Sequence, residues 1–287
     1  MMKRMVKEKM LGRFETFLRT GEKSQATISK YLCDIRKLMN YARGREVDKG
    51  LVLSYKEKLL EEDGYKVSSI NSFLAAANCF FGYMGWHDLK VKAYKVQQEA
   101  FYPENKCLSK EEYFRLVKEA KRRGKGRLAM ILQTICATGI RVSELGAVTV
   151  EAVKGDSVVV HNKGKVRTVL LPDSLRKELL YYISRKGIKK GIVFCTSSGK
   201  AVDRSNVWRE MKELCKEAGV EECKVFPHNL RHLFAQCFYG IKKDIVKLAD
   251  ILGHSSIDTT RIYTKTTSRE HRKQLDQMGL VLVCREQ

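Results

Sequence analysis

The chain has 287 residues, a formal net charge of +22 and an isoelectric point near 9.6. The length favours two domains, and a positive surplus of this size favours a polyanionic partner. Residues 1–100 hold 19 Lys/Arg against 12 Asp/Glu, a surplus of +7, which leaves +15 for the rest of the chain. A single basic tail is therefore excluded, and we expect both halves to contact the partner. A generic basic surface, such as ribosomal proteins carry, is the alternative that composition leaves open.

Nine cysteines are scattered through the sequence, with no Cys-x-x-Cys pair. An odd number of scattered cysteines indicates reduced thiols rather than a disulfide framework or a zinc site. The N-terminus lacks an apolar run of signal-peptide length, and no segment is apolar enough to span a membrane. These features predict a soluble intracellular protein.

The first hundred residues are typical of an all-α helical bundle, because their apolar residues recur at helical spacing. Phe17 lies on the apolar face of the first predicted helix, the third ends near Gly64, and Ser68 or Ser69 can cap the fourth. The four apolar stripes lie within residues 10–18, 28–39, 52–59 and 70–84. Residues 1–97 are thus predicted to form one domain, followed by a linker at 101–105.

Residues 106–287 are predicted to form a second domain, of mixed α+β structure. Ser109 and Glu112 form a capping box, and Gly139 is placed to end an apolar helix at 128–136. A β-hairpin is expected from strands at 157–161 and 166–171. Further helices are expected at 174–186, 204–218, 229–239, 243–252, around Tyr263, and at 268–278. The fold class is therefore mainly α with a small β-sheet.

Three stretches of the second domain carry cations, imidazoles and a tyrosine beside turns or helix starts. They read ATGIRVSEL at 137–145, HNLR at 228–231, and LGH at 252–254 with TRIY at 260–263. In this order, the strings resemble the tyrosine recombinase (phage integrase) family. The resemblance implies a site-specific DNA recombinase that cleaves and rejoins DNA through a covalent 3′-phosphotyrosyl intermediate.

Phosphodiester cleavage needs a nucleophile, stabilisation of the charged transition state, and a proton for the leaving oxygen. The sequence shows no paired carboxylates at metal-ligand spacing, so no metal or other cofactor is expected. Arginine can supply the cation, because its planar fork matches phosphate oxygens and stays charged. Arg141 follows the turn at Gly139, and His228 and Arg231 share one side of a helical turn. His254 stands at a helix end.

The resemblance implies a role for each of these positions. Arg141 and Arg231 would clamp the scissile phosphate, and His228 and His254 would help to bind it and manage protons. Glu144 matches an acidic position that supports this network.

The two remaining roles in the family are those of the nucleophile and the general acid. Tyr263 would be the nucleophile, a phenol with an ordinary pKa of about 10 that needs activation. Lys163, in the hairpin, would protonate the leaving 5′ oxygen. Lys165, two residues away, is the alternative general acid.

Each motif alone has an ordinary structural explanation. His-x-x-Arg pairs on basic helices are usually solvated, and Arg-x-x-Glu is usually a weak helical ion pair. The functional interpretation rests on the joint order and spacing of the strings. His232 is expected to point away from Arg231 in a structural role, and Trp86 is expected in the bundle core. Arg261 could contact DNA or face solvent.

The resemblance further implies that residues 1–97 are a core-binding DNA-binding domain and that 106–287 are the catalytic domain with a C-terminal tail. No arm-binding domain is expected, which favours a Xer-like or transposon-type enzyme. The implied partner is double-stranded DNA, bound by a homotetramer on two sites in the cytoplasm at the nucleoid, with no membrane; accessory DNA-bending proteins are left open. Residues 279–284 are predicted to dock into an adjacent subunit.

The implied task is integration or excision of a mobile element, or resolution of DNA. Two alternatives are a type IB topoisomerase-like enzyme with the same chemistry, and a DNA-binding regulator on the same fold. Intact candidate residues argue against the regulator.

Overall fold

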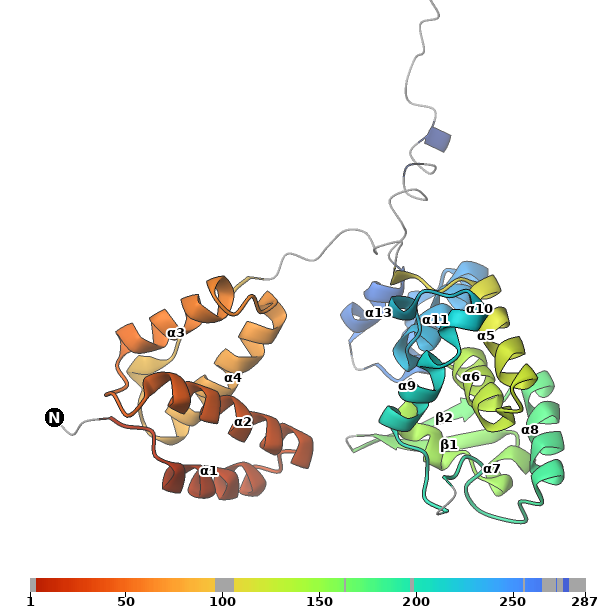
Figure 1. The fold of residues 1–287 in the computed structure, drawn as a ribbon, viewed down its shortest axis with the longest axis horizontal. Coiled ribbons are helices and arrows are strands. Elements are labelled where there is room, and N and C mark those ends of the chain that lie inside the picture. The colour runs from red at the N-terminus through yellow and green to blue at the C-terminus, as the bar shows by residue number, and fades with distance from the viewer. Residues whose placement is uncertain are drawn as a thin grey trace, which may run out of the picture. The chain divides into compact units, whose positions relative to one another are not determined.

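A computed structural model describes residues 4–95, 106–162, 164–196, 199–254, 256–264, 272 and 276–278. The chain divides into two compact units, Met1–Gln98 and Glu99–Gln287 (Figure 1). The predicted linker, Lys163, the tail at 279–284 and most of the helix predicted at 268–278 lie outside the described residues. No helix in the described ranges is long and apolar enough to cross a membrane.

The first unit is a bundle of α-helices around an aromatic core. Its helices are α1 Glu8–Thr20, α2 Gln25–Ala42, α3 Lys49–Glu61 and α4 Val67–Tyr83, with the 3-10 helix η1 at His87–Leu89. Helix α4 contacts α1, α2 and α3. Phe14 and Phe80 meet edge to face, with ring centroids 5.2 Å apart, and Trp86 packs against Phe80 as the sequence predicts.

Two details of the first unit differ from the sequence prediction. Phe17 is 45% exposed, because the buried stripe of α1 is Leu11, Phe14 and Leu18 and Phe17 lies at its edge. The predicted serine cap of α4 is wrong. The helix begins at Val67, so Ser69 already lies inside the first turn, where its N–H donates to the carbonyl of Lys66 at 2.8 Å.

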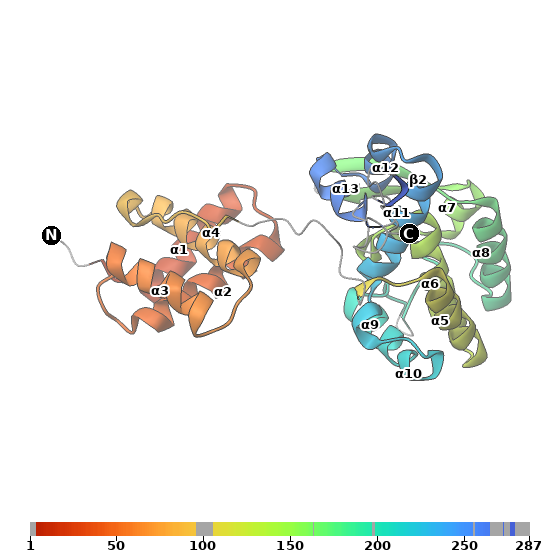
Figure 2. The ribbon, with the colours of Figure 1, turned by 90° about the horizontal axis from the view of Figure 1, so that it is seen from above.

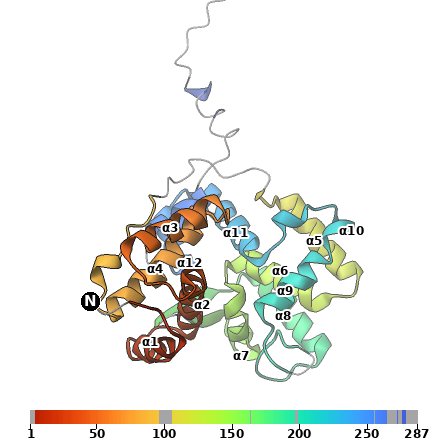
Figure 3. The ribbon, with the colours of Figure 1, turned by 60° about the vertical axis from the view of Figure 1, so that its left-hand side comes forward.

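The second unit contains a small antiparallel hairpin among helices. Its elements are α5 Lys110–Arg122, α6 Gly126–Thr138, η3 Val142–Ala147, α7 Val150–Lys154, β1 Ser157–Asn162, β2 Lys165–Leu170, α8 Asp173–Lys186, α9 Arg204–Lys212, α10 Cys215–Ala218, η4 Glu222–Lys224, α11 Pro227–Lys242, α12 Ile245–Leu252 and α13 Ile257–Thr264. Helix α11 contacts α6, α12 and α13 (Figure 2), and α5 lies beside α10 (Figure 3). The described fold is mainly α with a two-stranded sheet, as predicted.

Most predictions made from local sequence signals in the second unit are confirmed. The capping box of Ser109 and Glu112 forms at the start of α5, and Gly139 ends α6. The single helix predicted at 204–218 is wrong, because it divides into α9 and α10. At the break, the guanidinium of Arg123 donates to the carbonyl of Glu213 at 3.1 Å, an acceptor that a continuous helix would use for its own ladder.

Candidate active site

Arg141 is positioned by the glycine that ends α6. Gly139 has a φ of +64°, and a Cβ there would lie 2.5 Å from Cδ1 of Phe234, so only glycine fits. The chain then turns into η3 with Arg141 at its N-cap. The Arg141 N–H donates to Oε2 of Glu144 at 2.9 Å, and its guanidinium donates to Oε1 at 3.0 Å. Glu144 thus contacts Arg141 directly, through both the backbone and the side chain of the arginine.

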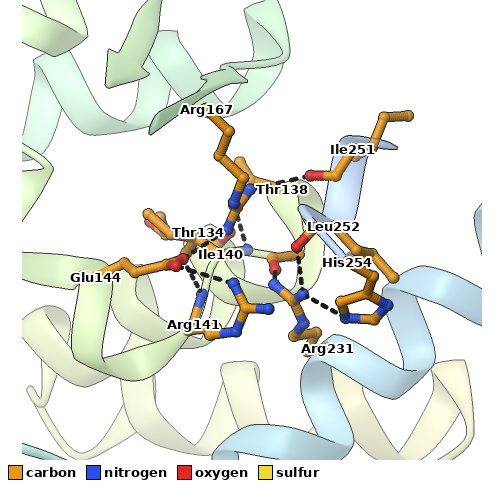
Figure 4. Close-up of polar contacts among 11 residues, drawn as sticks. Thr134, Thr138, Ile140, Arg141, Glu144, Arg167, Arg231, Ile251, Leu252 and His254 are labelled. Carbon is orange, nitrogen blue, oxygen red and sulfur yellow. Dashed lines mark hydrogen bonds and ion pairs between the residues drawn. The ribbon is translucent and has the colours of Figure 1, made fainter. Parts of the chain in front are cut away.

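Glu144 is shared between two guanidinium groups (Figure 4). The carboxylate is 6% exposed and also accepts from Nη2 of Arg167 at 2.6 Å. Burial acts to raise the pKa of Glu144, but the Arg141 N–H and the two arginine charges outweigh it and hold this pKa below its ordinary value. Glu144 therefore stays ionised and fixes both arginines.

Sequence reasoning missed Arg167. It lies on β2 opposite Val160, and its Nη1 donates to the carbonyl of Ile251 at 2.9 Å, which joins the hairpin to the end of α12. Strand alternation is the signal that could have found it, because Arg167 falls on the same face as buried Val169. An arginine at an inward strand position needs an anionic or carbonyl partner.

Arg231 is the most deeply placed cation of the site, with 2% of its surface exposed. From α11 its guanidinium donates to the carbonyls of Gly139 and, at 2.7 Å, of Leu252. Its Nη2 also lies 3.1 Å from Nε2 of His254. Burial lowers the pKa of Arg231 to about 10, and the Arg141 charge adds to this, so the side chain stays charged at neutral pH. The structure therefore brings Arg231 and His254 together.

His254 follows Gly253, which ends α12 with a φ of +64°. Its Nδ1 lies 2.8 Å from Oγ1 of Thr260, a residue with no exposed surface. Burial lowers the pKa of His254 to about 4, and the charges of Arg231 and Arg141 act in the same direction. The imidazole is therefore neutral at physiological pH. Thr260 is a second residue that sequence reasoning missed, because a threonine inside a helix gives no signal of its own.

Tyr263 lies on α13 with 3% of its surface exposed, surrounded by imidazoles. The His254 ring stacks on it, with centroids 5.8 Å apart and planes at 18°, and the His228 ring lies 6.0 Å away. Its side chain interacts with Arg231, which acts to raise the Arg231 pKa against the effect of burial. Burial lowers the pKa of His228, and the Arg231 charge adds to this.

His232 also contacts the tyrosine. Its ring meets Tyr263 edge to face, with centroids 5.1 Å apart, and burial lowers its pKa to about 4. The side chain thus packs against the Tyr263 ring, and its structural role stays a prediction. Arg261, on the same helix as Tyr263, is exposed and lies 3.7 Å from Asp258.

The structure brings five of the six predicted catalytic positions into one unit: Arg141, His228, Arg231, His254 and Tyr263. The sixth, Lys163, lies outside the described residues, as does the side chain of Lys165. The choice between the two lysines therefore stays open. In the described ranges, no cluster of three or more His, Cys, Asp or Glu could hold a metal ion.

The arrangement concentrates positive charge beside a phenol. In the described contacts Arg141 and Arg167 pair with the ionised carboxylate of Glu144, whereas Arg231 is held by neutral carbonyls. Such a site is suited to an oxyanion with several oxygens, because the arginines can donate to it without proton transfer.

Residues 106–270 match the model of the phage integrase family. Over 288 aligned residues, the chain is 30% identical to tyrosine recombinase XerA of Pyrococcus furiosus, covering 98% of each chain. It is 26% identical to tyrosine recombinase XerD of Listeria monocytogenes, covering 85% of this chain and 89% of the relative.

The chain also resembles solved structures. A crystal structure of XerA recombinase matches with a TM-score of 0.54 and 26% identity, covering 96% of this chain and 99% of that one. A lambda integrase dimer bound to a COC′ core site matches with a TM-score of 0.72 at 16% identity, covering 92% of this chain and 97% of that one. The second likeness concerns the fold alone.

Proposed function

We propose, from the premise that this chain belongs to the phage integrase family and is a site-specific tyrosine recombinase, that Tyr263 is its nucleophile. The observation that carries the proposal is the surroundings of the Tyr263 ring. His254 stacks on it, His228 lies 6.0 Å away, and Arg231 interacts with its side chain. A phenol beside neutral imidazoles and an arginine can lose its proton and attack a bound phosphate.

The proposed reaction exchanges one phosphate ester for another. The Tyr263 oxygen attacks the phosphorus, the bond to the 5′ oxygen breaks, and a 3′-phosphotyrosyl ester forms. His228 is available to accept the phenol proton, because its lowered pKa keeps it neutral. Lys163 would give a proton to the leaving 5′ oxygen. The ester conserves the bond energy, so the reverse step can join a different DNA strand.

Arg141 and Arg231 are the proposed clamp on the scissile phosphate. The guanidinium of Arg141, at the N-cap of η3, is held by Glu144, and that of Arg231, on α11, is held by the Leu252 carbonyl. The cations therefore need no rearrangement when charge develops. Arg167 is already committed to Glu144 and Ile251, and in this proposal it holds the clamp rather than the substrate.

The proposed assembly is a homotetramer on two sites in double-stranded DNA, acting in the cytoplasm at the nucleoid. Residues 1–97 would form the core-binding domain and 106–287 the catalytic domain, and both would contact the duplex. The basic surplus in both halves supports this division. Integration or excision of a mobile element and resolution of DNA are the tasks that this chemistry serves. The matched relatives do not favour the topoisomerase or the regulator.

The test is the covalent adduct. We expect Tyr263→Phe to abolish the 3′-phosphotyrosyl adduct on a DNA substrate whose cut strand diffuses away, while mobility-shift binding stays nearly unchanged. Tyr239→Phe is the matched control, since Tyr239 also packs in the apolar cluster beside Tyr263. If Tyr263→Phe still forms the adduct, another tyrosine is the nucleophile.

A further inference from the structure

We propose that Thr260 is a positioning residue that pairs with Nδ1 of His254 in either tautomer and so lets the tautomer change when DNA enters the site. The proposal rests on the proposed function, because the change serves the scissile phosphate. Its basis is a chain of three side chains, Arg231, His254 and Thr260, in which each group constrains the next.

The first step concerns Nε2 of His254. An arginine guanidinium has N–H donors and no acceptor. Since Nη2 of Arg231 lies 3.1 Å from Nε2, that nitrogen must present its lone pair. The neutral imidazole then carries its proton on Nδ1 and donates it to Oγ1 of Thr260 at 2.8 Å. In the DNA-free protein, the contacts thus select one tautomer.

The second step concerns what a bound phosphate requires. A phosphate oxygen is an acceptor, and it would compete for the Arg231 donor that now faces Nε2. A lone pair on Nε2 would then face a negative oxygen, whereas an N–H would donate to it. Binding therefore favours the other tautomer of His254. One proton leaves Nδ1 to water and one arrives at Nε2 from water, so the imidazole stays neutral.

The third step concerns the partner of Nδ1. A hydroxyl can accept from Nδ1–H or donate to the Nδ1 lone pair by rotating about its C–O bond, which a carbonyl or carboxylate cannot do. Thr260 is therefore a partner that satisfies both tautomers. It has no exposed surface, so bulk water does not replace it. It also lies one helical turn before Tyr263, so the docking of α13 places both side chains together.

The neighbouring threonine provides a matched control. Thr259 is exposed, and its hydroxyl donates to the carbonyl of Ser256, the residue before α13, and not to the imidazole. Thr260→Val removes the hydroxyl but keeps the shape, and Thr260→Ser keeps the hydroxyl. Thr259→Val makes the same chemical change on the same helix without touching His254.

The experiment measures the His254 tautomer by ¹⁵N NMR of the imidazole nitrogens in the full chain, with the signal identified by its loss in His254→Gln. We expect the proton on Nδ1 in the DNA-free protein and on Nε2 in a complex of Tyr263→Phe with intact site DNA. We expect Thr260→Val to lose the single tautomer and to cleave about tenfold more slowly, whereas Thr260→Ser and Thr259→Val stay within about twofold of the unsubstituted protein.

The proposal is overturned if the tautomer is the same with and without DNA, or if Thr260→Val cleaves at the unsubstituted rate. It is also overturned if Thr260→Ser is as slow as Thr260→Val at equal thermal stability, since the methyl group would then be what matters. Should Thr260→Val not fold, the two NMR states of the chain with native Thr260 decide the question. If the unsubstituted protein forms no DNA adduct, the proposed function fails, and the DNA-free tautomer still tests the role of Thr260.

Discussion

Arg231 combines deep burial with a charge that no carboxylate neutralises in its described contacts. Its partners are the carbonyls of Gly139 and Leu252 and the imidazole of His254. Carbonyl dipoles stabilise the guanidinium without cancelling its charge, so the positive potential is available to a substrate. Burial removes water from the guanidinium and so disfavours its charged form, which lowers the pKa of Arg231.

We expect Arg231→Ala to slow single-turnover DNA cleavage by about 10²- to 10³-fold, because a preorganised donor to the phosphate is lost. Arg231→Lys should not restore the rate, since one ammonium cannot reach the two carbonyls and a phosphate as the planar fork does. Circular dichroism controls for folding. Cleavage by the unsubstituted protein should persist in EDTA, and cleavage that depends on added metal would contradict the arginine mechanism.

Buried histidines give a pH dependence of stability. The pKa values of His232 and His254 are lowered from 6.5 to about 4, mainly by burial. Below pH 6.5 the unfolded chain takes up protons at these positions that the folded chain does not. The free energy of unfolding should therefore fall as pH decreases from 6.5 towards 4.5.

Urea unfolding midpoints at a series of pH values check this expectation. His232→Gln should make the pH dependence less steep, whereas His87→Gln, at an exposed position, should leave it unchanged. A midpoint that stays constant between pH 6.5 and 4.5 would contradict the burial of these imidazoles.

At the scale of elements, the Arg167 side chain of the hairpin lies close to Gly253 at the end of α12. A Cβ on Gly253 would lie 2.4 Å from Cδ of Arg167, and the glycine also has a φ of +64°. Gly187 ends α8 at the same φ of +64°, with nothing within 4 Å of its would-be Cβ. The two glycines therefore separate backbone strain from side-chain crowding.

We expect Gly187→Ala to lower the free energy of unfolding by about 1–2 kcal/mol through the left-handed backbone alone. Gly253→Ala should lose about 1–3 kcal/mol more, because the Arg167 side chain must move. Chemical denaturation measures both losses. Adding Arg167→Ala should reduce the extra loss at Gly253, and equal losses in the two single variants would contradict the close contact.

Elements that depend on local signals could be predicted from the sequence. The glycine at the end of α6, the capping box of α5 and the hairpin all depend on residues within a few positions of one another. Helices α9 and α10 could not be separated, because the break uses Arg123, the C-cap residue of α5. Arg167 was missed because its partners, Glu144 and Ile251, lie on other elements, and Thr260 because a threonine inside a helix gives no signal of its own.

At the scale of the whole molecule, the apolar residues beyond Met278 can be buried either in a neighbouring subunit or in their own domain. Residues 280–283 read LVLV and lie outside the described residues. If they dock into a neighbouring subunit, truncation after Met278 should leave single-site DNA binding unchanged but sharply reduce synapsis and recombination. Mobility shifts and a two-site recombination assay measure these effects. A truncated protein that unfolds or loses single-site binding would place the tail in its own domain.

The burial of Tyr263 has a consequence for the enzyme away from its target. With 3% of its surface exposed, the phenol is shielded from solvent by imidazole rings and α11. A reagent in solution must therefore pass this cover to reach the Tyr263 side chain. If Tyr263 is the nucleophile, as proposed, cutting is limited by access to this side chain as well as by chemistry, because the cover must move before a phosphate can reach it.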